Sequence, residues 1–196
     1  MKGRALWCAV HMIAVLALTM AAGALAQDPP LPVHLSGLIN DYTPETGVGG
    51  PWEIRGEWSL DIKGDSGTAN FSAAVNMTHS DFWVIELNGG NADDNSAKTG
   101  RHPHTHHITI TDGVVNRVSD TEFTMSGPVF VTADGSPAPF MPHCTPSTPC
   151  TLTVDITGGT SVQFSNITLT FGGPSNGPTS HFGTQPIHGV VVRSSK

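Results

Sequence analysis

The chain of 196 residues has few basic side chains, nine Lys and Arg against sixteen Asp and Glu. Removal of residues 1–26, the expected export signal, takes two basic residues away and leaves a formal charge of −9 with neutral histidines. A surface this acidic repels the phosphates of nucleic acids and of anionic lipids. The composition therefore predicts no nucleic-acid partner and no binding to an anionic membrane surface.

Cysteine is scarce as well, with three residues in all, and Cys8 lies in the expected export signal. The other two, Cys144 and Cys150, form a nearby pair that predicts a disulfide in an oxidising compartment. Their spacing is not the Cys-x-x-Cys of redox sites. The sequence also has no phosphate-binding glycine loop of the P-loop type.

Residues 1–26 have the layout of a secretory signal. Lys2 and Arg4 precede an almost wholly apolar stretch over 6–25, and a small-x-small site ends at Ala26. An uncleaved membrane anchor is the alternative, but no basic cluster follows the apolar stretch. We expect cleavage after Ala26, a secreted or periplasmic mature chain, and no further run long enough to span a bilayer.

Short alternating strands dominate the rest of the sequence, and no amphipathic helix is evident. Over 52–63 apolar residues occupy every second position and charged residues most of the others, which is typical of a half-buried antiparallel strand. Asp112-Gly113 predicts a hairpin turn between strands 105–111 and 114–119. The further expected strands are 33–40, 69–77, 82–87, 122–132, 151–157, 161–171 and 187–193.

This pattern predicts an all-β fold with one antiparallel, barrel-like domain over 33–196, after a short linker at 27–32. A jelly-roll sandwich is the alternative. Gly56, in the middle of a strand, indicates a coil or a close approach of backbones. The strand with two tryptophans resembles those of lipocalin-like and allene-oxide-cyclase-like barrels, a resemblance of fold alone. The expected interior binds a small apolar ligand or is filled by its own side chains, with Trp52, Trp58, Phe71, Met77 and Trp83 as its lining.

Histidine is the commonest basic residue of the mature chain, and it concentrates in one segment. If this segment is extended, one face carries His102, His104, His106, Ile108 and Ile110. The isoleucines mark that face as inward and place His107 outside. Imidazoles at alternate strand positions can share one metal ion, and neutral imidazole suits zinc, copper or iron. Pro103 supports the alternative of an exposed loop with no metal.

Other side chains are candidates to complete such a site. His181 is the foremost, because it lies in a Gly/Pro-rich segment of the kind that lines barrel mouths. His79 and His143 are further candidates, and His34 and His188 would come together if the barrel closed with the last strand paired near the first. For acid–base chemistry beside a metal the candidates are Asp81, Asp112 and His181.

Three functions therefore stand side by side. The first is an exported binding barrel that holds a transition metal or a small ligand through the histidine strand. The second is a metal-dependent enzyme that uses the same histidines, and the third is an extracellular structural or adhesion module. The cupin pattern is not met, because no glutamate follows the His-x-His pairs before Glu122.

Overall fold

The computed structural model describes residues 31–43, 51–64, 67–79, 103–158 and 164–195. Strands dominate these ranges, and within them α4 (Thr179–Phe182) is the sole α-helix, while η2 (Met141–His143) is a 3₁₀ turn. The strands are β1 (His34–Tyr42), β2 (Trp52–Ile62), β3 (Thr68–His79), β4 (His104–Ser119), β5 (Glu122–Pro128), β6 (Phe130–Ala133), β7 (Ser136–Pro137), β8 (Thr151–Thr157), β9 (Asn166–Gly172) and β10 (Ile187–Ser195).

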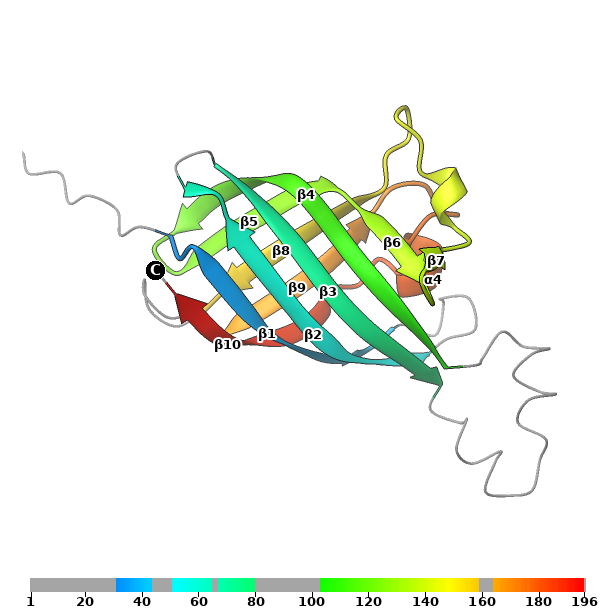
Figure 1. Ribbon diagram of the computed structural model, residues 1–196, viewed down its shortest axis with the longest axis horizontal. Helices are drawn as coiled ribbons and strands as arrows, with labels where there is room; N and C mark the ends of the chain where they lie inside the picture. Colours follow the sequence, from blue (N-terminus) through cyan, green and yellow to red (C-terminus); the bar gives the residue numbers. More distant parts are fainter. Residues whose placement is uncertain (1–30, 44–50, 65–66, 80–102, 159–163, 196) are drawn as a thin grey trace, which may run out of the picture.

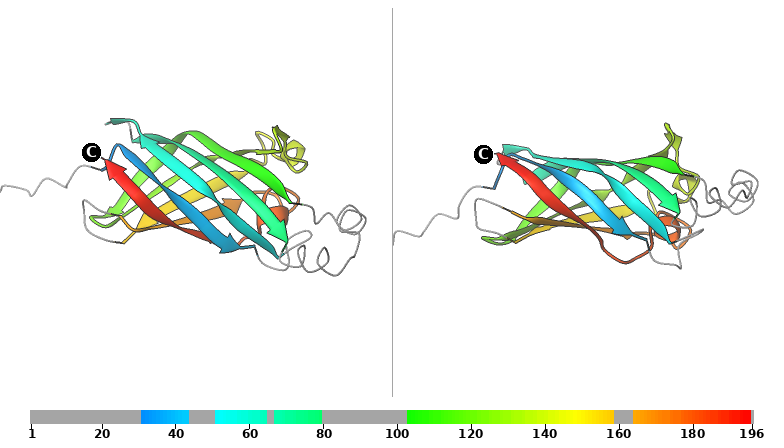
Figure 2. Two further views of the ribbon diagram at one scale, coloured as in Figure 1. Left: turned by 60° about the horizontal axis from the view of Figure 1, so that its bottom comes forward. Right: turned by 90° about the horizontal axis from the view of Figure 1, so that it is seen from below.

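Eight strands close into an antiparallel barrel. The sheet runs β3-β2-β1-β10-β9-β8-β5-β4, and pairing between β3 and β4 joins its two edges. The strands cross the barrel at a slant in every view, as closure requires (Figures 1 and 2). The prediction of an all-β barrel is thus confirmed, and the sandwich is excluded by the β3–β4 pairing.

Asp112-Gly113 was predicted as a hairpin turn, and this prediction is wrong. Both residues lie inside the single strand β4, which pairs with β3 on either side of them. A type I′ turn needs positive φ at both central residues. Asp112 has φ 53°, but Gly113 is not in the left-handed region. The register shifts between Ala69 and Phe71 of the partner strand, so the dipeptide forms a bulge that bends β4.

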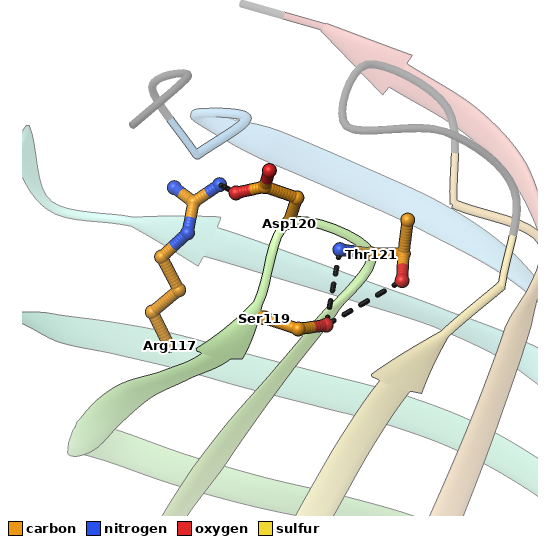
Figure 3. A network of polar contacts seen from close by, with 4 residues as sticks. All are labelled: Arg117, Ser119, Asp120 and Thr121. Carbon is orange, nitrogen blue, oxygen red and sulfur yellow. Dashed lines mark hydrogen bonds and ion pairs between the residues drawn. The ribbon is translucent and has the colours of Figure 1, made fainter. Parts of the chain in front are cut away.

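The chain reverses instead at 119–122, where β4 passes into β5. Figure 3 shows the side chains of this turn: Arg117 donates to Asp120 at 3.2 Å. The Ser119 hydroxyl oxygen accepts from the backbone N–H of Thr121, also at 3.2 Å. Such side-chain bonds to nearby backbone are typical of Ser and Asp in tight turns.

The predicted strand 122–132 is divided at Val129 into β5 and β6. β5 lies between β4 and β8 in the barrel wall, whereas β6 pairs with the first half of β4. β6 and β7 form a hairpin through Asp134 and Gly135, whose φ values of 47° and 84° suit a type I′ turn. This hairpin, α4 and η2 gather at one end of the barrel, away from the C-terminus (Figure 1).

The barrel interior is packed with apolar side chains. Trp52, Trp58, Phe71 and Met77 are each at most 2% exposed, and the rings of Trp58 and Phe71 stack at 6.4 Å. Trp83 and the predicted strand 82–87 lie outside the described residues. The burial of these four side chains and the stacking of two of them favour the alternative in which the interior is filled by the protein itself, and an interior ligand stays a prediction.

The predicted close approach at Gly56 is present. A Cβ atom added there would lie 2.0 Å from the carbonyl oxygen of Ala74 on β3. Gly37 allows a similar approach to β10, where the Trp58 indole donates to the Val190 carbonyl oxygen at 3.3 Å. Because these two glycines have no side chain, β2 can approach β3 closely at Gly56, and β1 can approach β10 closely at Gly37.

The predicted Cys144–Cys150 disulfide is confirmed, with the two Cα atoms 5.1 Å apart. It closes the connection between β7 and β8 at the same end of the barrel as α4. That helix lies in the Gly/Pro-rich segment around His181, where no helix was predicted. Across the described ranges, no helix is both long enough and apolar enough to cross a bilayer.

Candidate metal centre

Three imidazoles converge at the end of the barrel that carries α4. The Nε2 atoms of His104 and His181 are 3.1 Å apart, and those of His106 and His181 are 3.0 Å apart. One nitrogen from each of the three rings lies within 4.8 Å of the others. The cluster joins residues that are more than seventy positions apart in the chain, so the fold and not a local motif creates it.

β4 places the first two histidines through its alternation. His104 pairs with Met77 and His106 with Val75 across the β3–β4 ladder, and both imidazoles face inward. His106 is 2% exposed, and the isoleucines that follow it on the same face are buried. His107 faces outward and is exposed, as the alternation predicts.

α4 supplies the third histidine. Phe182 is fully buried, and its ring stacks on Phe171 of β9 at 4.4 Å. This contact anchors the short helix on the barrel end, and the preceding side chain, His181, then reaches the other two imidazoles. The helix begins after Pro178 and ends at Phe182, and the following residue, Gly183, has a φ of 81°, which suits glycine after a helix C-terminus.

Burial keeps two of the imidazoles neutral near neutral pH. Burial, with a smaller contribution from the neighbouring His104, lowers the pKa of His106 to about 4, and the hydrogen bond to Thr132 offsets part of the shift. Burial, together with His106 and His104, lowers the pKa of His181 to about 3. Neutral imidazole is the form that ligates metal ions, so these two rings offer lone pairs without first losing a proton.

The tautomer of His106 is fixed by its second nitrogen. Nδ1 lies 2.9 Å from the backbone carbonyl oxygen of Thr132 on β6, and a carbonyl oxygen only accepts hydrogen bonds. Nδ1 therefore carries the proton, and Nε2, which faces His181, presents a lone pair. A backbone carbonyl behind a histidine ligand is the usual outer contact in metal sites.

A pocket of about 510 Å³ opens onto all three histidines. Its other lining residues come from the β6–β7 hairpin, from η2 and the segment before it, and from α4 and the loop before it: Ala133, Asp134, Pro139, Phe140, His143, Asn176 and Ser180. Apart from His143, these were not singled out from the sequence. Asp134-Gly135 was a readable turn signal, but nothing local connects that turn to His181.

Of the other predicted site residues, those that the structure describes lie outside the three-histidine cluster. His102 and Asp81 lie outside the described residues. Asp112 pairs with Lys63 and is exposed, at the bulge of β4. It is therefore not an acid–base partner of the three histidines.

His34 and His188 lie apart, because β1 and β10 are antiparallel and His34 is paired with Ser195. His34 Nδ1 is 2.6 Å from Asp61, and His188 Nδ1 is 2.8 Å from Asp41. Hydrogen bonds from His188 and Tyr42 outweigh the effect of burial and lower the pKa of Asp41. Each of these histidines thus contacts a carboxylate at the surface of the barrel, away from the three-histidine cluster.

The loop before α4 has the spacing Gly-x-Ser-x-Gly, with Ser175 at its centre. In α/β-hydrolases this spacing forms a nucleophile elbow between a strand of the central sheet and a long helix. Here it connects the antiparallel strand β9 to a helix of four residues. The structural context of an elbow is therefore missing, and Ser175 is not assigned as a nucleophile.

Comparison of the chain with protein-family models, with curated proteins and with solved structures found no match.

Proposed function

We propose that the protein is an exported β-barrel that binds one transition-metal ion through His104, His106 and His181. The observation that carries the proposal is the convergence of the three imidazole rings. The Nε2 atom of His181 lies 3.1 Å from that of His104 and 3.0 Å from that of His106. Imidazole nitrogens about 2.0–2.1 Å from a tetrahedral zinc ion lie roughly 3.3 Å from one another. Both separations to His181 are thus close to those of such a site, and all three ligand nitrogens lie within 4.8 Å of one another.

Two further properties support this function. The lowered pKa values of His106 and His181 keep both rings free of competing protons at neutral pH. The hydrogen bond to Thr132 orients His106 with its lone pair toward the cluster. Three imidazoles suit zinc, copper or iron, and nitrogen ligands alone disfavour magnesium and calcium.

The export signal and the disulfide suggest where the protein works. A disulfide persists in secreted and periplasmic proteins and is rare in the cytosol. The Cys144–Cys150 bond therefore agrees with the signal expected at residues 1–26 and with cleavage after Ala26. In our proposal the mature protein binds its metal ion outside the cytosol.

The test is metal analysis and calorimetric titration of the purified, chelator-treated mature chain with Zn²⁺, Cu²⁺ and Fe²⁺. We expect one ion per chain. Alanine at His104, His106 or His181 should weaken binding by roughly a hundredfold or more, because each removes a ligand. His107→Ala, an outward-facing neighbour on the same strand, is the matched control and should bind like the wild type.

Retention of full affinity in the triple variant H104A/H106A/H181A would overturn the proposal and favour a structural or adhesion module. His102 remains a predicted ligand, so His102→Ala is measured in the same series. A loss of affinity there would add a fourth protein ligand to the three.

A further inference from the structure

The three-histidine site opens in one direction. On its barrel side, the edge of Trp52 packs against His104 with ring centroids 5.0 Å apart, and Phe182 packs against His106 at 5.1 Å. Both aromatic side chains are fully buried. The other side is the pocket lined by all three histidines. Within the part of the chain that the structure describes, the pocket is therefore the side from which an external ligand can reach a bound ion.

No carboxylate or thiolate of the described residues joins the three histidines in the cluster. Zinc sites with three protein ligands keep their fourth position for water or substrate, whereas structural zinc sites use four protein ligands. The histidine count and the adjoining pocket together correspond to the first kind of site. An ion held here would have a coordination position that an external ligand can occupy.

The charge of the site selects an anion for that position. Three neutral imidazoles leave the two positive charges of a divalent ion uncompensated in a half-enclosed site. Among the described residues that line the pocket, Asp134 is the sole acidic one, and its carboxylate accepts a hydrogen bond from the backbone of Thr105 at 3.0 Å. A ligand that brings its own negative charge therefore gains most from the ion.

The other residues that line the pocket indicate the chemical character of the rest of that ligand. Pro139 and the buried ring of Phe140 form an apolar wall, and Phe140 also packs against His181 with centroids 5.8 Å apart. Asn176, Ser180 and His143 add polar groups to the lining. A volume of about 510 Å³ is within the range of small-molecule sites and exceeds the need of a bare inorganic anion.

We infer that the pocket binds a small carboxylate with an apolar or aromatic body, whose carboxylate takes the open position of the metal ion. The inference rests on the proposed metal site. It deepens that function, because the protein then recognises an organic anion through its metal ion.

The test uses the mature chain loaded with Co²⁺, whose visible absorption reports changes in coordination. Metal content is measured first, so that failure of the metal site and failure of the ligand site are told apart. Azide, acetate and benzoate are then titrated as probes. We expect all three to change the spectrum, and benzoate to bind at least about tenfold more tightly than acetate, because its ring is buried against Phe140.

Phe140→Leu should reduce the ratio of benzoate to acetate affinity, and His107→Ala should leave it unchanged. The inference is overturned if the loaded protein shows no spectral response to any of the three anions. Equal affinity for acetate and benzoate would overturn the inference that the ligand has an apolar or aromatic body. Response to azide only after His102→Ala would show that a protein ligand fills the fourth position, and would overturn the open site.

Discussion

The Nδ1–H group of His106 donates to the backbone carbonyl oxygen of Thr132, 2.9 Å away, across the β4–β6 pairing. This hydrogen bond connects the hairpin that lines the pocket to a histidine of the cluster. It also decides which ring nitrogen faces His181. The orientation of the site therefore depends on β6, a strand that lies outside the closed ring of eight.

The first prediction concerns the tautomer of His106. In the metal-free protein near neutral pH, we expect the proton on Nδ1 and a bare Nε2, because the Thr132 carbonyl oxygen requires a donor. Long-range ¹H–¹⁵N NMR of the imidazoles measures this directly. When Zn²⁺ is added, the Nδ1 proton should persist while the Nε2 resonance shifts. A proton found on Nε2 would contradict the assignment.

The second prediction concerns stability against pH in the metal-free protein. The folded-state pKa values of His106 and His181, about 4 and about 3, lie below the ordinary value of 6.5, so the unfolded chain binds protons more readily. Stability is then fully present above about pH 6.5 and is lost as the pH falls toward 4. For His106 alone the loss from about pH 7 to about pH 5 is on the order of 2 kcal/mol.

Urea denaturation with a chelator present, at several pH values, measures this loss. His106→Gln should flatten the pH dependence, because glutamine can still donate to Thr132 but does not titrate. His107→Gln changes an exposed histidine on the same strand and should leave the slope unaltered. Equal slopes in the wild type and in His106→Gln would contradict the prediction.

The third prediction concerns the barrel wall. Gly56→Ala should lower the free energy of unfolding by about 3 kcal/mol, since the added Cβ would meet backbone atoms of Ala74 and Val75 at 2.0 and 2.7 Å. Gly172→Ala is the matched control in another strand, where the added Cβ meets the Thr151 hydroxyl, the end of a side chain, at 2.7 Å. We expect it to cost about 1 kcal/mol or less. Similar losses in both variants would contradict the argument.

The strands and the inward histidines could be predicted because their causes are local. Alternation with period two depends on neighbours in the sequence alone, and Ile108 and Ile110 mark which face of β4 is buried. His106 follows from that parity. The disulfide was predictable in the same way, from the short distance between Cys144 and Cys150 in the chain and the export that we expect from residues 1–26.

The two Asp-Gly pairs show where local reasoning ends. Asp134-Gly135 forms a hairpin turn, whereas Asp112-Gly113 forms a bulge within β4. The dipeptide permits both, and the continuous ladder with β3 decides the second case. The outcome depends on a partner strand that is distant in the sequence.

The same limit applies to the third histidine. His181 was favoured over His188 for the site because of its loop composition, and the structure brings His181 to the cluster. The stacking of Phe182 on Phe171 positions His181. This contact joins α4 to β9, and the alternation of apolar and polar residues along the sequence does not predict it. The antiparallel register of β1 and β10 separates His34 from His188. The sequence indicated that the two strands could pair, but it did not give the register of that pairing.

The last prediction concerns the disulfide and the site together. Cys150 lies under the loop that leads to α4, since a Cβ atom added at Gly177 would lie 3.0 Å from its Sγ atom. Cys144 directly follows η2, and Phe140, just before η2, packs against His106 and His181. Loss of the disulfide should therefore loosen both loops that surround the cluster.

For the variant C144A/C150A we expect the free energy of unfolding to fall by about 2 kcal/mol, from the entropy of closing a short loop. The affinity for Zn²⁺ should fall several-fold in the same variant. Calorimetric titration measures the affinity at a temperature where the variant is folded by circular dichroism, so that unfolding does not account for the loss. Reduction of the wild type with a phosphine that is free of thiols should reproduce the effect. Unchanged zinc affinity in a folded, disulfide-free protein would show that the two loops hold the histidines without the bond.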